Sequence, residues 1–313
     1  MYLDTAPTAD TPETHRLRVG ALDIAYDVRG EGEPLLLVPG LTMARLMWPE
    51  ELCDLLARTG FRVIRMDNRD SGESSHFEGR PPNVLKLLQK SVVGLPFTVP
   101  YTLEDMANDA FALMTSLGHE RFHVAGASMG GMIAQTMAIM APERLLTLTS
   151  IMSGPGGRRY AIGKLGALRA LLTPLPKDAA QHIDHLVGTF RVLNGDELPF
   201  DELASRRYAE VHCASGLSPA ASARQLGAIF HSAGRRMPLV WKIGTPTLVI
   251  HGSADPLLPL RGAVAMARNI AGAELVVVPG MGHNFPPSSV PQVAGAIASH
   301  ARRAALRART KAA

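Results

Sequence analysis

A serine lies in a short pattern that could make it a nucleophile. Residues 126–130 read Gly-Ala-Ser-Met-Gly, which fits G-x-S-x-G and places the serine at Ser128. The apolar run 122–125 before it indicates a short buried strand, and the apolar run 129–141, followed by Pro142, indicates a buried helix. A strand, a sharp turn and a helix hold such a serine in a strained conformation with its hydroxyl exposed. We therefore predict a nucleophile elbow at Ser128.

The glycines of the pattern have a steric purpose. Gly126 and Gly130 lie two residues on either side of the serine, where a Cβ atom would collide with the neighbouring strand and helix. The start of the following helix also directs free N–H groups at the site, where negative charge would develop during acyl transfer.

A serine hydroxyl needs a general base, and the base needs an orienting group. In the elbow arrangement these follow the serine in the order acid, then histidine, each on a loop after a strand. Asp255 follows the predicted strand 247–250, and His283 follows the predicted strand 274–278. We predict that His283 takes the Ser128 proton and that Asp255 fixes the tautomer of His283 and stabilises its charged form.

Two backbone N–H groups should bind the oxyanion. One is predicted at Met129, directly after the nucleophile, and the other at Leu41, in the loop after the strand 35–38. Asp67 and Asp70 are rival acids, but both precede Ser128. Together with the arginine between them, they are predicted to brace their loop by charge-assisted hydrogen bonds.

The elements that must position these residues alternate along the chain. Helices are predicted at 50–59, 103–117, 129–141, 260–270 and 290–303, and most of them lie between two predicted strands. Predicted strands lie at 16–19, 23–28, 35–38, 61–66, 122–125, 145–152, 247–250 and 274–278. This order predicts an α/β fold with a mostly parallel twisted sheet and helices on both faces, with the first two strands as an antiparallel hairpin at the edge.

The alternation stops between residues 154 and 241. Proline-punctuated helical stretches replace it, at 162–172, 179–193, 200–212 and 220–231. We predict an α/β core of residues 1–153 and 242–313, with 1–14 disordered, and a helical cap or lid at 154–241 over the carboxyl ends of the strands.

Composition narrows the class of protein. The chain has 313 residues, 46% of them hydrophobic. Its net charge is +4, but the tail from residue 301 contains five basic residues and no acidic one, so the rest of the chain has a net charge of −1. A basic tail on a near-neutral body does not predict nucleic-acid binding. No secretory signal or membrane-length apolar run is visible, so we predict a cytoplasmic protein that does not bind membranes. The two cysteines give no disulfide framework, and no spacing predicts a metal or another cofactor.

Four segments together resemble a known family. The elbow, the stretch HGSADPLLP at 251–259, the stretch GMGHNFP at 280–286 and the stretch DNRDSGESS at 67–75 are similar to those of the α/β-hydrolase superfamily. They resemble in particular bacterial serine esterases of the aclacinomycin methylesterase type. The resemblance implies the α/β-hydrolase fold, the triad of Ser128, Asp255 and His283, and the oxyanion donors Leu41 and Met129.

These observations favour a cofactor-free serine hydrolase that cleaves small or medium apolar carboxylic esters through an acyl-enzyme. A C–C bond hydrolase of ring-fission products, or a perhydrolase or acyltransferase, would use the same three residues and remains an alternative. A non-catalytic ligand binder on the same fold is a third class. The predicted partner is a small-molecule ester, and a homodimer is left open.

Overall fold

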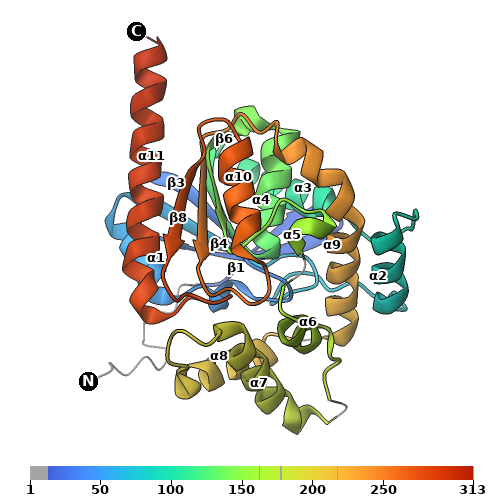
Figure 1. The fold of residues 1–313 in the computed structure, drawn as a ribbon. Helices are drawn as coiled ribbons and strands as arrows, with labels where there is room; N and C mark the ends of the chain where they lie inside the picture. Colours follow the sequence, from blue (N-terminus) through green and yellow to red (C-terminus); the bar gives the residue numbers. More distant parts are fainter. Residues whose placement is uncertain (1–12, 162, 177, 217, 313) are drawn as a thin grey trace.

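One sheet organises the fold. In the computed structural model, which describes residues 13–161, 163–176, 178–216 and 218–312, eight strands pair in the order β1-β2-β4-β3-β5-β6-β7-β8 (Figure 1). The strands are β1 (His15–Val19), β2 (Leu22–Arg29), β3 (Glu33–Val38), β4 (Phe61–Met66), β5 (Phe122–Ala127), β6 (Leu145–Ile151), β7 (Thr247–Gly252) and β8 (Glu274–Val278).

The strand directions agree with the prediction. β1 pairs antiparallel with β2, and β2 pairs antiparallel with β4, whereas the pairs from β4 to β8 are parallel. β5 and β7 are buried along their whole length, as expected of strands covered on both faces. All the parallel strands therefore end at one edge, and β5 lies near the middle of it.

Helices cover both faces of the sheet. On one face, α1 (Glu50–Arg58) and α11 (Val290–Ala312) enclose a core with Leu35, Leu37 and Ala125 of the central strands. On the other, α3 (Leu103–Ser116), α4 (Met129–Met140) and α10 (Leu260–Asn269) enclose a larger core. The α/β prediction is confirmed, because helices cover both faces of a mostly parallel sheet.

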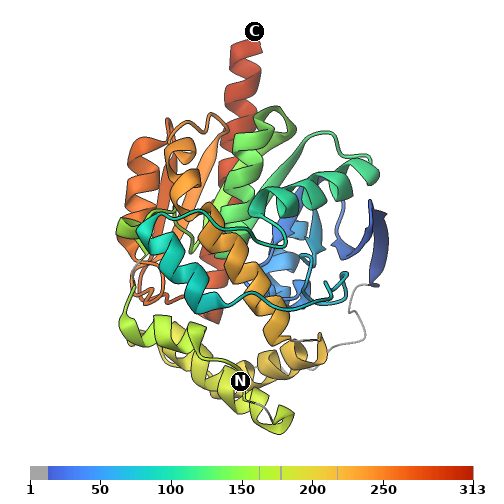
Figure 2. The ribbon, with the colours of Figure 1, turned by 90° about the vertical axis from the view of Figure 1, so that its right-hand side faces the viewer.

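The helices between β6 and β7 lie in two environments. They are α5 (Arg158–Ala161), α6 (Leu165–Leu172), α7 (His182–Asn194), α8 (Glu202–Ala214) and α9 (Pro219–Val240). Figures 1 and 2 show α7 and α8 at the end of the molecule opposite the projecting end of α11, where they share a small core of their own around Leu186, Val187 and Ala209. α9 instead contributes Ala228 and Val240 to the main core.

The sequence predicts two helix ends too early and misses one helix. The predicted helix 220–231 is the beginning of α9, which continues to Val240 with Pro238 inside it. The predicted end of the last helix at residue 303 is wrong, because α11 continues through the exposed basic tail to Ala312. α2 (Val84–Val93) was not predicted.

Most of the predicted disordered segment 1–14 lies outside the described residues. Thr14, which is described, accepts a hydrogen bond from Arg45 Nη2 at 2.5 Å.

Among the described helices, none is long and apolar enough to cross a membrane.

A buried histidine in α8 should make stability depend on pH. Burial lowers the pKa of His212 to about 4, whereas an unfolded histidine titrates near 6.5. Between these pH values the unfolded chain therefore binds more protons than the folded chain. The free energy of unfolding should decrease as the pH falls from about 6.5 toward 4. Between pH 7.5 and 5 we expect this group to lower the free energy of unfolding by about 2 kcal/mol.

Urea unfolding of wild type and His212→Leu at both pH values isolates this contribution, because the remaining titratable groups are common to both proteins. Equal pH dependence of the two would contradict the assignment.

Candidate active site

The turn after β5 holds Ser128 in a conformation that L-residues rarely adopt. Its φ and ψ are 55° and −117°, and α4 begins at the next residue. The backbone is held on both sides, because the Ser128 N–H donates to Ile151 O at 2.9 Å and the Ser128 carbonyl accepts from Ser153 Oγ at 2.8 Å. A strained residue fixed by its neighbours is typical of a functional site.

The glycines around it are required by contact with backbone atoms. A Cβ on Gly126 would lie 2.1 Å from Gly130 O, and a Cβ on Gly130 would lie 2.0 Å from Val38 O. A Cβ on Gly131 would lie 2.6 Å from Ser153 Cβ. The close approach of β3, β5 and α4 that forms the turn therefore excludes any side chain at Gly126 and Gly130, and Ser153 leaves no space for one at Gly131.

The structure brings together the three residues predicted as a triad. His283 Nε2 lies 2.9 Å from Ser128 Oγ, and His283 Nδ1 lies 2.8 Å from Asp255 Oδ2. A carboxylate only accepts hydrogen bonds, so Nδ1 carries the ring proton and Nε2 is left to accept from the serine hydroxyl. This is the geometry in which an imidazole can remove the serine proton.

Asp255 is fully enclosed and held as a carboxylate. Its Oδ1 accepts from the N–H groups of Leu257 and Leu258 at 2.8 and 2.9 Å. Burial raises its pKa, but the adjacent His283 and His251 and these hydrogen bonds outweigh burial, and the net pKa lies below that of an ordinary aspartate. His251 Nε2 lies 2.8 Å from Leu258 O and 3.5 Å from Asp255 Oδ2.

The loop that carries His283 is fixed by the helical insertion. The His283 N–H donates to Leu193 O at 2.7 Å, and Asn284 Nδ2 donates to Asn194 Oδ1 at 2.9 Å. A Cβ on Gly282 would lie 2.2 Å from Asn194 O. The end of α7 therefore sets the position of His283, the predicted general base. Sequence reasoning did not foresee this contact because the two segments are about 90 residues apart.

The predicted oxyanion donors lie on the two segments that meet beside Ser128. Met129 is the first residue of α4, where a backbone N–H has no partner within the helix. Leu41 follows Gly40, at which a Cβ would lie 3.5 Å from Ser128 Cβ. The loop after β3 thus lies against the nucleophile.

The rival acids are occupied elsewhere. Asp67 Oδ2 accepts from Arg45 Nη1 at 2.6 Å, and Asp70 Oδ2 accepts from Arg224 Nε at 2.7 Å. Arg69 pairs with Asp109. The 67–75 segment is therefore braced by charge-assisted hydrogen bonds as predicted, although its charged side chains pair with distant residues and not with one another.

A small apolar recess borders the elbow. Its cavity volume is about 10 Å³, room for about one water-sized group. It is lined by Pro39, Gly40, Met43, Met47, Trp48, Ala127 and Phe285. Ala127 and Gly40 directly precede Ser128 and the predicted donor Leu41, so the recess adjoins the predicted reaction site.

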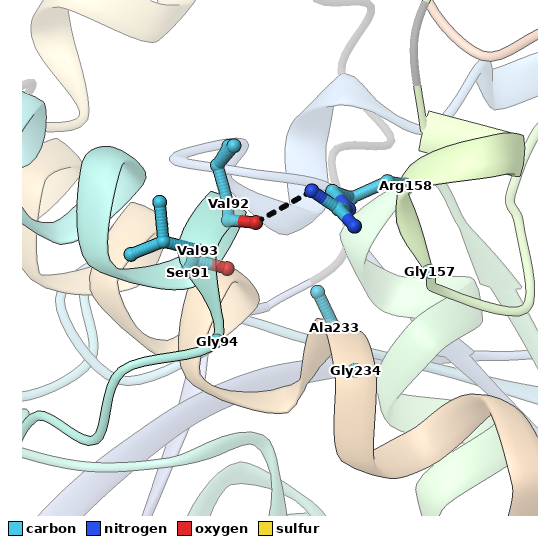
Figure 3. Close-up of a pocket in the computed structure, with 8 residues that line it drawn as sticks. All are labelled: Ser91, Val92, Val93, Gly94, Gly157, Arg158, Ala233 and Gly234. Atoms are coloured by element: carbon cyan, nitrogen blue, oxygen red, sulfur yellow. Dashed lines mark hydrogen bonds between the residues drawn. The ribbon is translucent and has the colours of Figure 1, made fainter.

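A larger cavity lies elsewhere, between α2, α5 and α9 (Figure 3). Its volume is about 310 Å³, and Arg158 Nη1 donates across it to Val92 O at 2.8 Å. None of Ser128, Asp255 and His283 lines it. In the described part of the chain, no group of three or more His, Cys, Asp or Glu side chains could hold a metal ion.

Comparison with known proteins places the chain in a family. Residues 33–288 match the model of the alpha/beta hydrolase fold family. The chain is 30% identical over 301 residues to the rhodomycin D methylesterase DauP of Streptomyces sp. (strain C5), covering 87% of this chain and 92% of that protein. It is 29% identical over 306 residues to the rhodomycin D methylesterase DnrP of Streptomyces peucetius, with the same coverage.

A solved structure has the same fold. A hydrolase from Pseudomonas aeruginosa PA01 superposes with a TM-score of 0.70 at 24% sequence identity, covering 93% of this chain and 99% of that one.

The chain belongs to the α/β hydrolase fold family. The predicted resemblance to methylesterases of the aclacinomycin type is confirmed, and so is the prediction of an enzyme of the carboxylic ester hydrolase class.

The elbow glycines give a direct test of the packing. Gly126→Ala or Gly130→Ala should lower the free energy of unfolding by about 3 kcal/mol or more, because each new methyl meets a backbone carbonyl that cannot move away. Thermal and urea unfolding measure the loss. Gly295→Ala, in α11 with no atom near the new Cβ, is the matched control and should gain about 0.5–1 kcal/mol. Equal stabilities of the elbow and control variants would show that Gly126 and Gly130 are not packed against backbone carbonyls.

Proposed function

We propose that the chain hydrolyses carboxylic esters through an acyl-enzyme on Ser128. The observation that carries the proposal is the single imidazole of His283, within hydrogen-bond distance of both Ser128 Oγ and Asp255 Oδ2. A serine hydroxyl is a weak nucleophile on its own, and this arrangement supplies the base and its orienting group.

In the first step, Ser128 Oγ attacks the ester carbonyl while His283 Nε2 takes the hydroxyl proton. The oxygen that becomes negative is bound by the N–H groups of Met129 and Leu41. Collapse of this intermediate breaks the bond to the alcohol oxygen, which receives the proton from His283. The acyl group is then an ester of Ser128.

In the second step, a water molecule gives a proton to His283 and attacks the acyl carbonyl. Ser128 Oγ leaves and recovers the proton, and the carboxylic acid departs. Asp255 stays ionised throughout, since its low pKa favours the carboxylate beside a charged imidazole.

We further propose that the substrate is a methyl ester of an apolar carboxylic acid. The support comes from the methylesterase relatives and from the recess beside Ala127 and Gly40, which has room for a group no larger than a methyl. The insertion 154–241, whose α7 carbonyls hold the His283 loop, would act as a cap that encloses the acid portion.

Removal of the nucleophile tests the reaction. Ser128→Ala should lower kcat/KM for p-nitrophenyl esters at least about 10⁴-fold, because no other group in the site replaces the attacking oxygen. Steady-state hydrolysis of the purified protein is the measurement. Ser116→Ala, at an exposed serine of α3, is the control and should keep wild-type activity. Undiminished hydrolysis by Ser128→Ala would end the proposal.

Enlarging the recess tests the alcohol preference. Met43→Ala removes a half-buried side chain from its wall, and we expect kcat/KM for a butyl ester relative to the methyl ester of the same acid to rise about tenfold. Met140→Ala, at the exposed end of α4, should leave this ratio unchanged. An unchanged ratio in Met43→Ala would show that the alcohol group binds elsewhere.

A further inference from the structure

A fully buried glutamine of α9 reaches the loop that carries the predicted oxyanion donor. Gln225 Oε1 accepts from the Thr42 N–H at 2.6 Å, and Gln225 Nε2 donates to Arg69 O at 2.8 Å and to Ser71 Oγ at 2.9 Å. A backbone N–H can only donate and a carbonyl can only accept, so the amide has one orientation. Every polar atom of the side chain is satisfied.

The loop needs this support because its turn is strained. The Met43 N–H donates to Gly40 O at 3.2 Å and closes a turn in which Thr42 has a φ of 56°. That position of such a turn favours glycine, and a β-branched residue there costs about 1–2 kcal/mol. The hydrogen bond from the Thr42 N–H to Gln225 Oε1 offsets part of this cost.

Anchors lie on both sides of the peptide that carries the Leu41 N–H. The preceding peptide is held at Pro39 O, which accepts from Asn68 Nδ2 at 3.0 Å. The following peptide is held at the Thr42 N–H by Gln225. Because a trans peptide points its N–H opposite to its carbonyl, and Gly40 O is turned toward Met43, the Leu41 N–H points out of the turn.

We propose that Gln225 is a positioning residue, which couples helix α9 to the oxyanion loop and keeps the Leu41 N–H aimed at the reacting oxygen. This inference rests on the proposed function. Oxyanion donors act on the transition state, so loss of the alignment should lower kcat while substrate binding changes little.

Gln225→Met is close in shape and removes both polar functions. We expect kcat for a p-nitrophenyl ester to fall about 10- to 100-fold, less than the loss of a whole donor, with KM within about threefold of wild type. The buried carboxyl of Gln225→Glu lies against the Arg69 carbonyl, which favours its protonated form. In that form it accepts from the Thr42 N–H and donates to Arg69 O, and it should restore kcat to within about fivefold of wild type. Ser71→Ala removes one partner of Nε2 without touching Thr42 and should keep kcat within about threefold.

Thermal unfolding shows whether each variant is folded at the assay temperature. If Gln225→Met is not, Gln225→Asn takes its place, because it stays polar but withdraws the acceptor by about 1.5 Å. A kcat within twofold of wild type for the folded variant, or equal losses in Gln225→Met and Gln225→Glu, would overturn the proposal. Ser128→Ala in the same assay separates the two hypotheses: if it is active, the proposed function fails, and if it is inactive while Gln225→Met is normal, only the role of Gln225 fails.

Discussion

The close approach of three backbone segments at the end of β5 is the constraint on which the rest of the site depends. Val38, Gly126 and Gly130 meet so closely that a single methyl on either glycine would overlap a carbonyl oxygen. This contact forces Ser128 into a positive φ and lifts its hydroxyl above the sheet. The cost of the strained turn is offset by burial of β5 and α4 within the main core.

The parallel sheet then determines which other segments can reach the serine. β7 and β8 end at the same edge as β5, and the loops after them supply Asp255 and His283. The insertion completes the edge from the other side, since Leu193 O of α7 accepts from the His283 N–H and Gln225 of α9 accepts from the Thr42 N–H in the loop after β3. Core and insertion are therefore linked by hydrogen bonds at the residues that would carry the chemistry.

Local signals in the sequence were enough to predict the eight strands, most of the helices and the three residues that meet at the edge. The apolar runs located the strands, the glycines located the elbow, and the chain order of Asp255 and His283 located the partners. The same signals did not reveal the hydrogen bonds of Gln225 and Asn194, because each joins segments that are about 90 or more residues apart.

Helix length was also hard to predict. The predicted helix 220–231 ends before Pro238, yet α9 continues past this proline and packs Val240 into the main core. Burial of this kind overrides the local preference of proline, and it is not visible in a linear pattern.

The most direct test of the account is the site of covalent attachment of a fluorophosphonate, which mimics the tetrahedral intermediate. Peptide mass spectrometry after stoichiometric inactivation should find the phosphonyl group on Ser128, and His283→Ala should react far more slowly. Attachment to a different residue, or inactivation that is equally fast without His283, would contradict the account.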